Sequence, residues 1–225
     1  MILYRWKNLY RWKKKVIEAF DFDGTLTNGD SFLLFARYVK GNRFFLKGLV
    51  WHLPVLVAMK LRLYPNWKAK QALFSYYFEG MSVSDFDQFA RAFALDHPAL
   101  IRKDTFARMK KHVQNGDQIV VVSASMENWI RPFFDAIPGI RFLCTRPEID
   151  PAGSLTGCFE SLNCHGAEKV SRFLRQYPAR EEYMLYAYGD SNGDRQLLQF
   201  ADHSFYCRRG IRPIDPANPG RGGVR

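Results

Sequence analysis

Cysteine is scarce in this sequence, and its four copies follow neither a metal-binding nor a redox pattern. Cys144, Cys158, Cys164 and Cys207 form no C-x-x-C pair and have no zinc-like spacing. No continuous apolar segment follows the basic residues near the N-terminus, so we expect no secretory leader. The sequence therefore predicts reduced thiols and a cytoplasmic location.

The sequence also lacks an apolar run long enough to cross a bilayer. Between Lys47 and Lys60 lie twelve uncharged residues, interrupted by His52 and Pro54, whereas a spanning helix needs about 20 apolar residues. We interpret residues 44–64 as an interfacial helix or an apolar wall over a binding site. Packing inside the domain is the alternative.

Acidic residues are missing from the first fifteen positions, which carry six bases. Residues 208–225 carry five bases and one acid, so the two ends supply ten of the eleven net positive charges. Residues 16–207 are nearly neutral, and this distribution gives no support to a long nucleic-acid groove.

The N-terminal segment contains the tetrapeptide Tyr-Arg-Trp-Lys twice, at residues 4–7 and 10–13. On a helix, Ile2, Leu3, Trp6, Leu9 and Tyr10 would share one face. A basic amphipathic helix with aromatic residues is typical of segments that bind an anionic lipid surface. Residues 1–15 are therefore interpreted as an extension that holds the protein on the inner face of the membrane, with packing against the core as the alternative.

The rest of the chain alternates between strand and helix patterns. Helical spacing or helix-end signals occur at residues 31–39, 67–81, 84–95, 98–116 and 166–177, with Asn66 and Ser84 as expected N-terminal residues. Strands are expected at 16–20, 118–125, 141–145, 182–190 and 203–207, and a hairpin at 148–157. This order predicts an α/β fold with a Rossmann-like, mainly parallel sheet and helices on both faces.

Polar side chains stand where three of these strands end. Asp21 and Asp23 follow the first, Ser123 closes the second, and Asp190 and Asp194 follow a later one. Ligands bind at the carboxyl ends of strands in such sheets. Four carboxylates repel one another unless a cation compensates them, and oxygen ligands with water and a phosphate suit Mg²⁺. With the ammonium of Lys169 and the hydroxyl of Ser123, they predict a site for phosphoryl transfer.

These motifs together resemble the haloacid dehalogenase-like (HAD) hydrolases, in the branch of the phosphoserine phosphatases. "DFDGTLT", "VVVSAS", Lys169 in "GAEKV" and "GDSNGD" match the four motifs of that family in order, over residues 16–207. The resemblance implies a catalytic core at 16–29 and 100–209 and a helical cap at 30–99. Residues 210–225 are rich in Gly, Pro and Arg, which predicts a flexible basic tail.

The resemblance also implies the role of each motif residue. Asp21 would be the nucleophile that forms an aspartyl-phosphate, and Asp23 the general acid/base. Mg²⁺ would be held by Asp21, the backbone carbonyl of Asp23, and Asp190, with support from Asp194. Ser123 and Lys169 would grip the phosphate.

The substrate is less clearly marked than the chemistry. Phosphoserine phosphatases carry Glu where this chain has Asp30, and their fourth motif places its Asn differently. The "DSFLLFARYVKG" helix, the apolar cap segment and the "DSN" motif with Leu197 and Leu198 are similar to bacterial phosphatidylglycerophosphatase C. We expect a phosphorylated lipid substrate; a soluble phosphomonoester such as phosphoserine is the alternative. A non-enzymatic basic binding protein is a remote one, and no nucleic-acid partner is expected.

Overall fold

A six-stranded sheet forms the centre of the computed structural model, which describes residues 14–214. Its order is β3-β2-β1-β6-β7-β8, and every neighbouring pair is parallel except β7–β8. The strands run over the following residues: β1 Lys15–Phe20, β2 Gln118–Met126, β3 Arg141–Thr145, β6 Tyr183–Gly189, β7 His203–Tyr206 and β8 Arg212–Pro213. β1 and β2 are almost wholly buried, as expected for the continuous apolar runs of central parallel strands.

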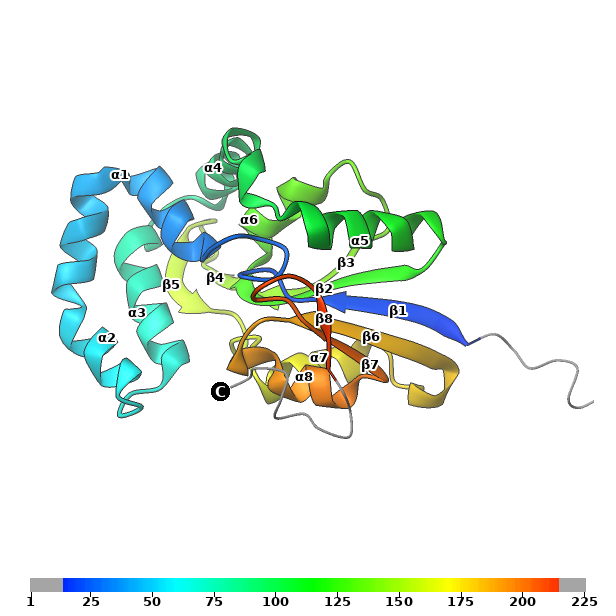
Figure 1. Ribbon diagram of the computed structural model, residues 1–225. Coiled ribbons are helices and arrows are strands. Elements are labelled where there is room, and N and C mark those ends of the chain that lie inside the picture. Colours follow the sequence, from blue (N-terminus) through cyan, green and yellow to red (C-terminus); the bar gives the residue numbers. More distant parts are fainter. Residues whose placement is uncertain (1–13, 215–225) are drawn as a thin grey trace, which may run out of the picture.

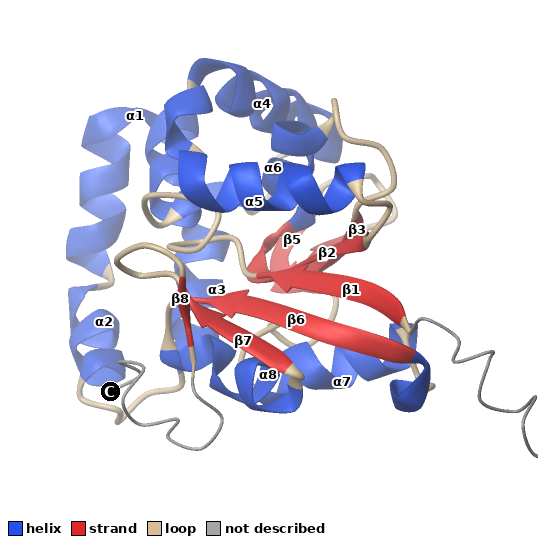
Figure 2. Ribbon diagram, turned by 45° about the vertical axis from the view of Figure 1, so that its right-hand side comes forward, coloured by secondary structure: helices blue, strands red, loops and turns tan. Residues whose placement is uncertain are grey.

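Helices cover both faces of this sheet (Figures 1 and 2). One face carries α5 (Lys103–Gln114) and α6 (Glu127–Ile130), and the other carries α7 (Ala167–Gln176) and α8 (Arg195–Phe200). The predicted Rossmann-like α/β architecture is thereby confirmed. A separate hairpin of β4 (Pro147–Ile149) and β5 (Leu155–Phe159) occupies the expected position.

A helical cap is inserted after β1 and lies beside the carboxyl ends of the strands (Figure 1). It contains α1 (Ser31–Trp51), α2 (Leu53–Lys60), α3 (Asn66–Phe78) and α4 (Val83–Asp96). The helix predicted at 31–39 continues well beyond its expected end, through a kink at Gly41, where φ is 71°. Such a φ is readily adopted by glycine.

Three helix starts differ from the sequence predictions. Asn66 is the first residue of α3 and not its cap, since Pro65 precedes the helix and no side chain caps it. α4 begins one residue early because Ser82, not Ser84, accepts the N–H of Asp85 at 3.1 Å. The predicted helix at 98–116 is split into a 3₁₀ turn at Pro98–Leu100 and α5.

The cap is joined to the core at two places. Its two connections run side by side, with the N–H of Asn28 on Leu100 O and that of Arg102 on Leu26 O, both at 2.9 Å. Farther out, the backbone of residues 80–83 bonds to residues 153–155 of the β4–β5 hairpin: Gly80 N to Leu155 O at 2.8 Å, and Leu155 N to Met81 O at 2.9 Å. The cap is thus paired by backbone hydrogen bonds with an element more than 70 residues away.

The chain beyond Gly210 does not start as the free tail that was predicted. Arg212–Pro213 form β8 against β7, and Ile214 N donates to Ser204 O at 2.8 Å. Pairing of a sheet edge satisfies backbone groups that would otherwise be open. Residues 215–225 and the repeated tetrapeptide at 4–13 lie outside the described residues. Among residues 14–214, no helix has the length and apolar character to cross a membrane.

A buried carboxyl group lies under α5. Glu18 on β1 is fully buried, and its Oε1 is 3.0 Å from Nδ1 of His112, which also contacts Asp117 at 2.7 Å. Burial raises the pKa of Glu18 to about 7, against smaller opposing effects from Tyr188 and Arg108.

This raised pKa predicts a pH-dependent stability. The folded state keeps a proton that the unfolded state releases above pH about 4.5, so the stabilisation is complete below that pH and is lost as the pH rises through about 7. Glu18→Gln removes this titration. We expect the variant to gain stability over the wild type between pH 5 and pH 8, by up to about 3 kcal/mol. Urea unfolding at pH 5 and pH 8 measures the difference in unfolding free energy between the variant and the wild type. The same difference at both pH values would contradict the prediction.

Candidate active site

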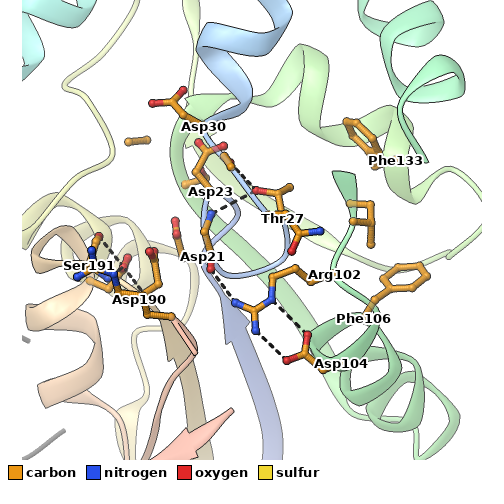
Figure 3. A pocket seen from close by; sticks show the side chains of 18 of the residues that line it. Asp21, Asp23, Thr27, Asp30, Arg102, Asp104, Phe106, Phe133, Asp190 and Ser191 are labelled. Atoms are coloured by element: carbon orange, nitrogen blue, oxygen red, sulfur yellow. Dashed lines mark hydrogen bonds and ion pairs between the residues drawn. The ribbon is translucent and has the colours of Figure 1, made fainter. Parts of the chain in front are cut away.

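The predicted site residues converge on one open cavity of about 1300 Å³ at the carboxyl ends of the strands (Figure 3). All six of them line it: Asp21, Asp23, Ser123, Lys169, Asp190 and Asp194. Parallel pairing explains this, because β1, β2 and β6 end at the same edge. Asp21 N also donates to Tyr188 O at 2.9 Å, which extends the β1–β6 ladder to the first catalytic candidate.

Lys169 links two of the carboxylates. Its Nζ is 2.6 Å from Oδ1 of Asp21 and 2.6 Å from Oδ1 of Asp194, and it donates to the carbonyl of Val122 at 2.8 Å. The side chain is only 2% exposed. Burial opposes the charge on Lys169, but the two carboxylates outweigh this effect and raise its pKa, so the ammonium stays protonated.

The carboxylates of Asp194 and Asp21 differ in the number of hydrogen-bond donors around them. Oδ2 of Asp194 accepts the N–H groups of Asp190 and Ser191 at 3.1 Å and the Ser191 hydroxyl at 2.9 Å. Burial raises the pKa of Asp194, but Lys169 and these donors more than offset it, and the pKa is lowered. Asp21 has Lys169 as its side-chain donor, so burial and the Asp194 charge raise the pKa of Asp21 well above its usual range.

Asp190 has a buried carboxylate oxygen, Oδ1, that lacks a hydrogen-bond partner. Burial, followed by the charge of Asp194, raises the pKa of Asp190 to about 6. Gly24 makes room for this carboxylate, since a Cβ at Gly24 would lie 2.3 Å from Asp190 Oδ2. The glycine of the first motif therefore allows the Asp190 side chain to approach the loop after β1.

The cluster fits a divalent cation. Carboxylate oxygens of Asp21, Asp190 and Asp194 lie within 4.8 Å of one another. The unpaired buried oxygen of Asp190 and the raised pKa values of Asp21 and Asp190 indicate a group of carboxylates that a bound cation would stabilise. Hard oxygen donors of this kind suit Mg²⁺.

Asp23 and Ser123 are held by different donors. The Asp23 carboxylate accepts the N–H of Ser31 at 2.7 Å and the hydroxyl of Ser125. Ser123 is buried, and its hydroxyl oxygen accepts the N–H of Ser125 at 3.1 Å. Asp23 therefore contacts both the first residue of α1 and the second motif of the core.

Several residues of the site were not identified from the sequence. Ser125 was not identified because it lies in the same predicted strand as Ser123 and no motif singles it out. Arg102 donates to Gly24 O at 3.0 Å and to Cys207 O, and pairs with Asp104 at 2.7 Å (Figure 3), but it stands in a loop with no motif around it. Lys70 of α3 donates to Ala124 O at 3.0 Å, which brings a cap ammonium beside the second motif.

Asp30 and His165 complete the cavity wall. Asp30 caps α1 by accepting the N–H of Leu33 at 3.1 Å; burial and the Asp23 charge raise its pKa, while Lys70 acts in the opposite direction. His165 precedes α7, and burial, then Lys169, lower its pKa, which favours the neutral imidazole.

Comparison with known proteins agrees with this geometry. A family model described as haloacid dehalogenase-like hydrolase matches residues 19–199. Protein CicA of Caulobacter vibrioides is 33% identical over 192 residues, which cover 85% of each chain.

Solved structures share the fold. A protein of unknown function from Bordetella pertussis Tohama I superposes with a TM-score of 0.73 at 18% identity, over 85% of this chain and 89% of that one. A phosphoserine phosphatase, captured as an analogue of its phospho-aspartyl intermediate, gives a TM-score of 0.59 at 17% identity, over 87% and 88%. The predicted likeness to phosphatidylglycerophosphatase C is not tested by these matches.

Proposed function

Because this chain belongs to the haloacid dehalogenase-like hydrolase family, we propose that it is a Mg²⁺-dependent phosphomonoester hydrolase that works through an aspartyl-phosphate on Asp21. Membership confirms the predicted hydrolase, and the fold shared with phosphoserine phosphatases supports a phosphatase. The observation that carries the mechanism is the set of Asp21, Lys169 and Asp194 at the strand ends, next to the orphaned oxygen of Asp190.

Asp21, Asp190 and the backbone carbonyl of Asp23 would hold the Mg²⁺ ion, and Asp194 would support it. The ion would neutralise charge on the carboxylates and on the phosphoryl group. Both oxygens of Asp194 are already hydrogen-bonded, so we assign it mainly to orienting Lys169 and the loop after β6.

The chain's own residues account for both half-reactions. A carboxylate oxygen of Asp21 forms a bond to phosphorus as the phosphorus–ester oxygen bond breaks, and Asp23 gives its proton to the departing alkoxide. Asp23, now ionised, takes a proton from the water that attacks phosphorus, which frees the Asp21 carboxylate and inorganic phosphate. Lys169 and Ser123 donate to the phosphoryl oxygens while charge builds up on them.

Asp23→Asn tests the acid role. An alkoxide leaving group needs a proton and a nitrophenolate does not, so we expect kcat/KM for an alkyl phosphate to fall by about 10²- to 10⁴-fold. The same parameter for p-nitrophenyl phosphate, which reports the steps up to Asp21 phosphorylation, should fall much less. Equal losses for both esters would argue against Asp23 as the acid.

For the substrate we propose a phosphorylated lipid head group, such as that of phosphatidylglycerophosphate. Part of the cavity lining is apolar: Phe106 and Phe133 stand across from Asp23 (Figure 3), and Leu95 and Ile101 also line the cavity. This apolar lining is better suited to the apolar part of a lipid ester than to a charged amino acid such as phosphoserine.

A soluble phosphatase for phosphoserine or a similar ester is the second candidate, favoured by the fold shared with phosphoserine phosphatases. A panel with Mg²⁺ separates the two. Faster turnover of a phosphorylated lipid in mixed micelles than of phosphoserine supports the first, and the reverse order supports the second.

A further inference from the structure

Positive charge is concentrated in one part of the cap. From Ser31 to Phe78 the sequence contains eight bases and no aspartate or glutamate. Six of the eight are exposed, namely Arg37, Arg43, Lys47, Lys60, Arg62 and Lys68. Residues 16–207 are nearly neutral as a whole because the strongly basic α1–α3 layer, residues 31–78, is balanced by an excess of acidic residues in the rest of that range.

The same layer exposes an apolar ridge, made of residues from the second half of α1, from α2 and from the turn after it. The ridge consists of Leu46, Val50, Trp51, Leu53, Val57, Leu61 and Leu63. Val50 is 71% exposed, Trp51 75% and Leu63 78%. The outward side of a helix in water is normally polar, and exposed apolar side chains gathered in one segment in this way indicate an interaction site.

The shape of the cap turns this ridge away from the core. After the kink at Gly41, α1 runs down the outer side of the cap and continues into α2, while α3 returns along the inner side (Figure 1). The inward residues Phe45 and Gly48 are buried, and Phe45 stacks on Tyr77 of α3. No residue of α2 is buried. Among the described residues, therefore, the layer has an inner side that packs and an outer apolar side that nothing covers.

We infer that this ridge docks the protein on an anionic phospholipid bilayer. The inference rests on the proposed function, because it supplies the surface on which a lipid phosphate would be met. The apolar side chains would enter the boundary between head groups and acyl chains. Tryptophan, here Trp51, is enriched at this boundary in membrane-bound proteins. Arg43, Lys47 and Lys60 would lie at the level of the lipid phosphates.

The charge around the ridge favours a bilayer over a second copy of this chain as its binding partner. A symmetric dimer through the ridge would bring two acid-free, basic surfaces together, since the same patch would occur on both sides. An anionic bilayer instead provides apolar depth and complementary charge at once. It is thus the occupant that satisfies both features of the layer.

Vesicle flotation of the full chain tests the docking surface. We expect the protein to float with vesicles of phosphatidylglycerol and phosphatidylcholine, to bind pure phosphatidylcholine less, and to lose binding as salt rises. The double variant Val50→Glu/Trp51→Glu should bind the anionic vesicles at least about tenfold more weakly, because both charged groups would have to enter the apolar boundary. It should keep its turnover of p-nitrophenyl phosphate in solution.

The matched control is Ile149→Glu/Leu162→Glu, which adds the same charge at two exposed apolar residues outside the cap. This control should bind vesicles like the wild type. Equal binding by the ridge variant and the control would overturn the proposal, as would a wild type that ignores anionic vesicles. The ridge would instead be assigned to a second copy if the wild type does not bind vesicles, is a dimer by light scattering, and becomes a monomer in the ridge variant.

Catalysis and docking fail separately in this design. Asp21→Asn protein should float like the wild type even though it is inactive. If it stays active, the proposed mechanism falls while the docking result stands. If an active wild type does not float, the docking proposal alone falls.

Discussion

Asp21→Asn is expected to lower phosphomonoester hydrolysis by about 10⁴-fold or more, because the amide cannot attack phosphorus and the two-step route disappears with it. The same change removes a carboxylate whose pKa is raised by burial and by the neighbouring Asp194. Without Mg²⁺, the variant should therefore be at least as stable as the wild type. Steady-state kinetics with p-nitrophenyl phosphate and thermal unfolding in EDTA measure the two effects.

The control for this variant is Asp135→Asn, which makes the same chemical change at an exposed aspartate away from the cavity. It should leave both activity and stability near the wild-type values. Activity retained by Asp21→Asn would remove Asp21 as the nucleophile. Activity lost together with the fold would contradict the electrostatic description of the site.

Lys169→Met should have the largest effect on stability. It leaves the buried carboxylates of Asp21 and Asp194 without their shared cation, and breaking a buried pair in this way costs about 3–5 kcal/mol. The loss should be greatest at neutral and higher pH and should shrink as the pH falls and the carboxylates take up protons. Turnover should also fall by about 10²- to 10³-fold through the lost donor to the phosphoryl group.

A double variant distinguishes this electrostatic cause from poor packing of the new side chain. Lys169→Met/Asp194→Asn removes one of the two uncompensated charges and should recover at least about half of the lost stability in EDTA, without restoring activity. Urea unfolding of both variants between pH 5 and pH 8 gives the comparison. A double variant no more stable than Lys169→Met would show that packing dominates.

The convergence of the candidate site residues could be predicted because most of them lie at strand ends. Asp21, Ser123 and Asp190 each lie where a buried apolar run stops, and parallel pairing brings such ends together. The interpretation of β2 was less complete: the strand continues to Met126, with a register shift against β3 between Ser123 and Met126. Ser125, at this irregularity, therefore faces Asp23, a contact that strand periodicity does not reveal.

The cap was harder to predict because its helices depend on tertiary packing. Gly41 would normally suggest a helix end, yet Phe45 and Gly48 pack on α3 and hold the helix on the far side of the kink. Three alternatives were left open for residues 44–64: an interfacial helix, an apolar wall over the binding site and packing inside the domain. None of these residues lines the cavity, and the segment has both buried and exposed apolar side chains. Sequence periodicity did not separate them, since residues such as Val50 and Leu49 are equally apolar but differ in exposure.

The central position of β1 has a consequence for synthesis on the ribosome. β1 is made first, but its two neighbours are β2 and β6, and Val16 pairs with Met184. For most of translation this apolar strand therefore has at least one open edge, and closing it requires a contact across more than 160 residues. Nascent chains that stop before β6 would expose that edge. The arrangement that gathers the candidate catalytic acids thus makes the fold depend on β6, which begins only at Tyr183, to protect its first strand.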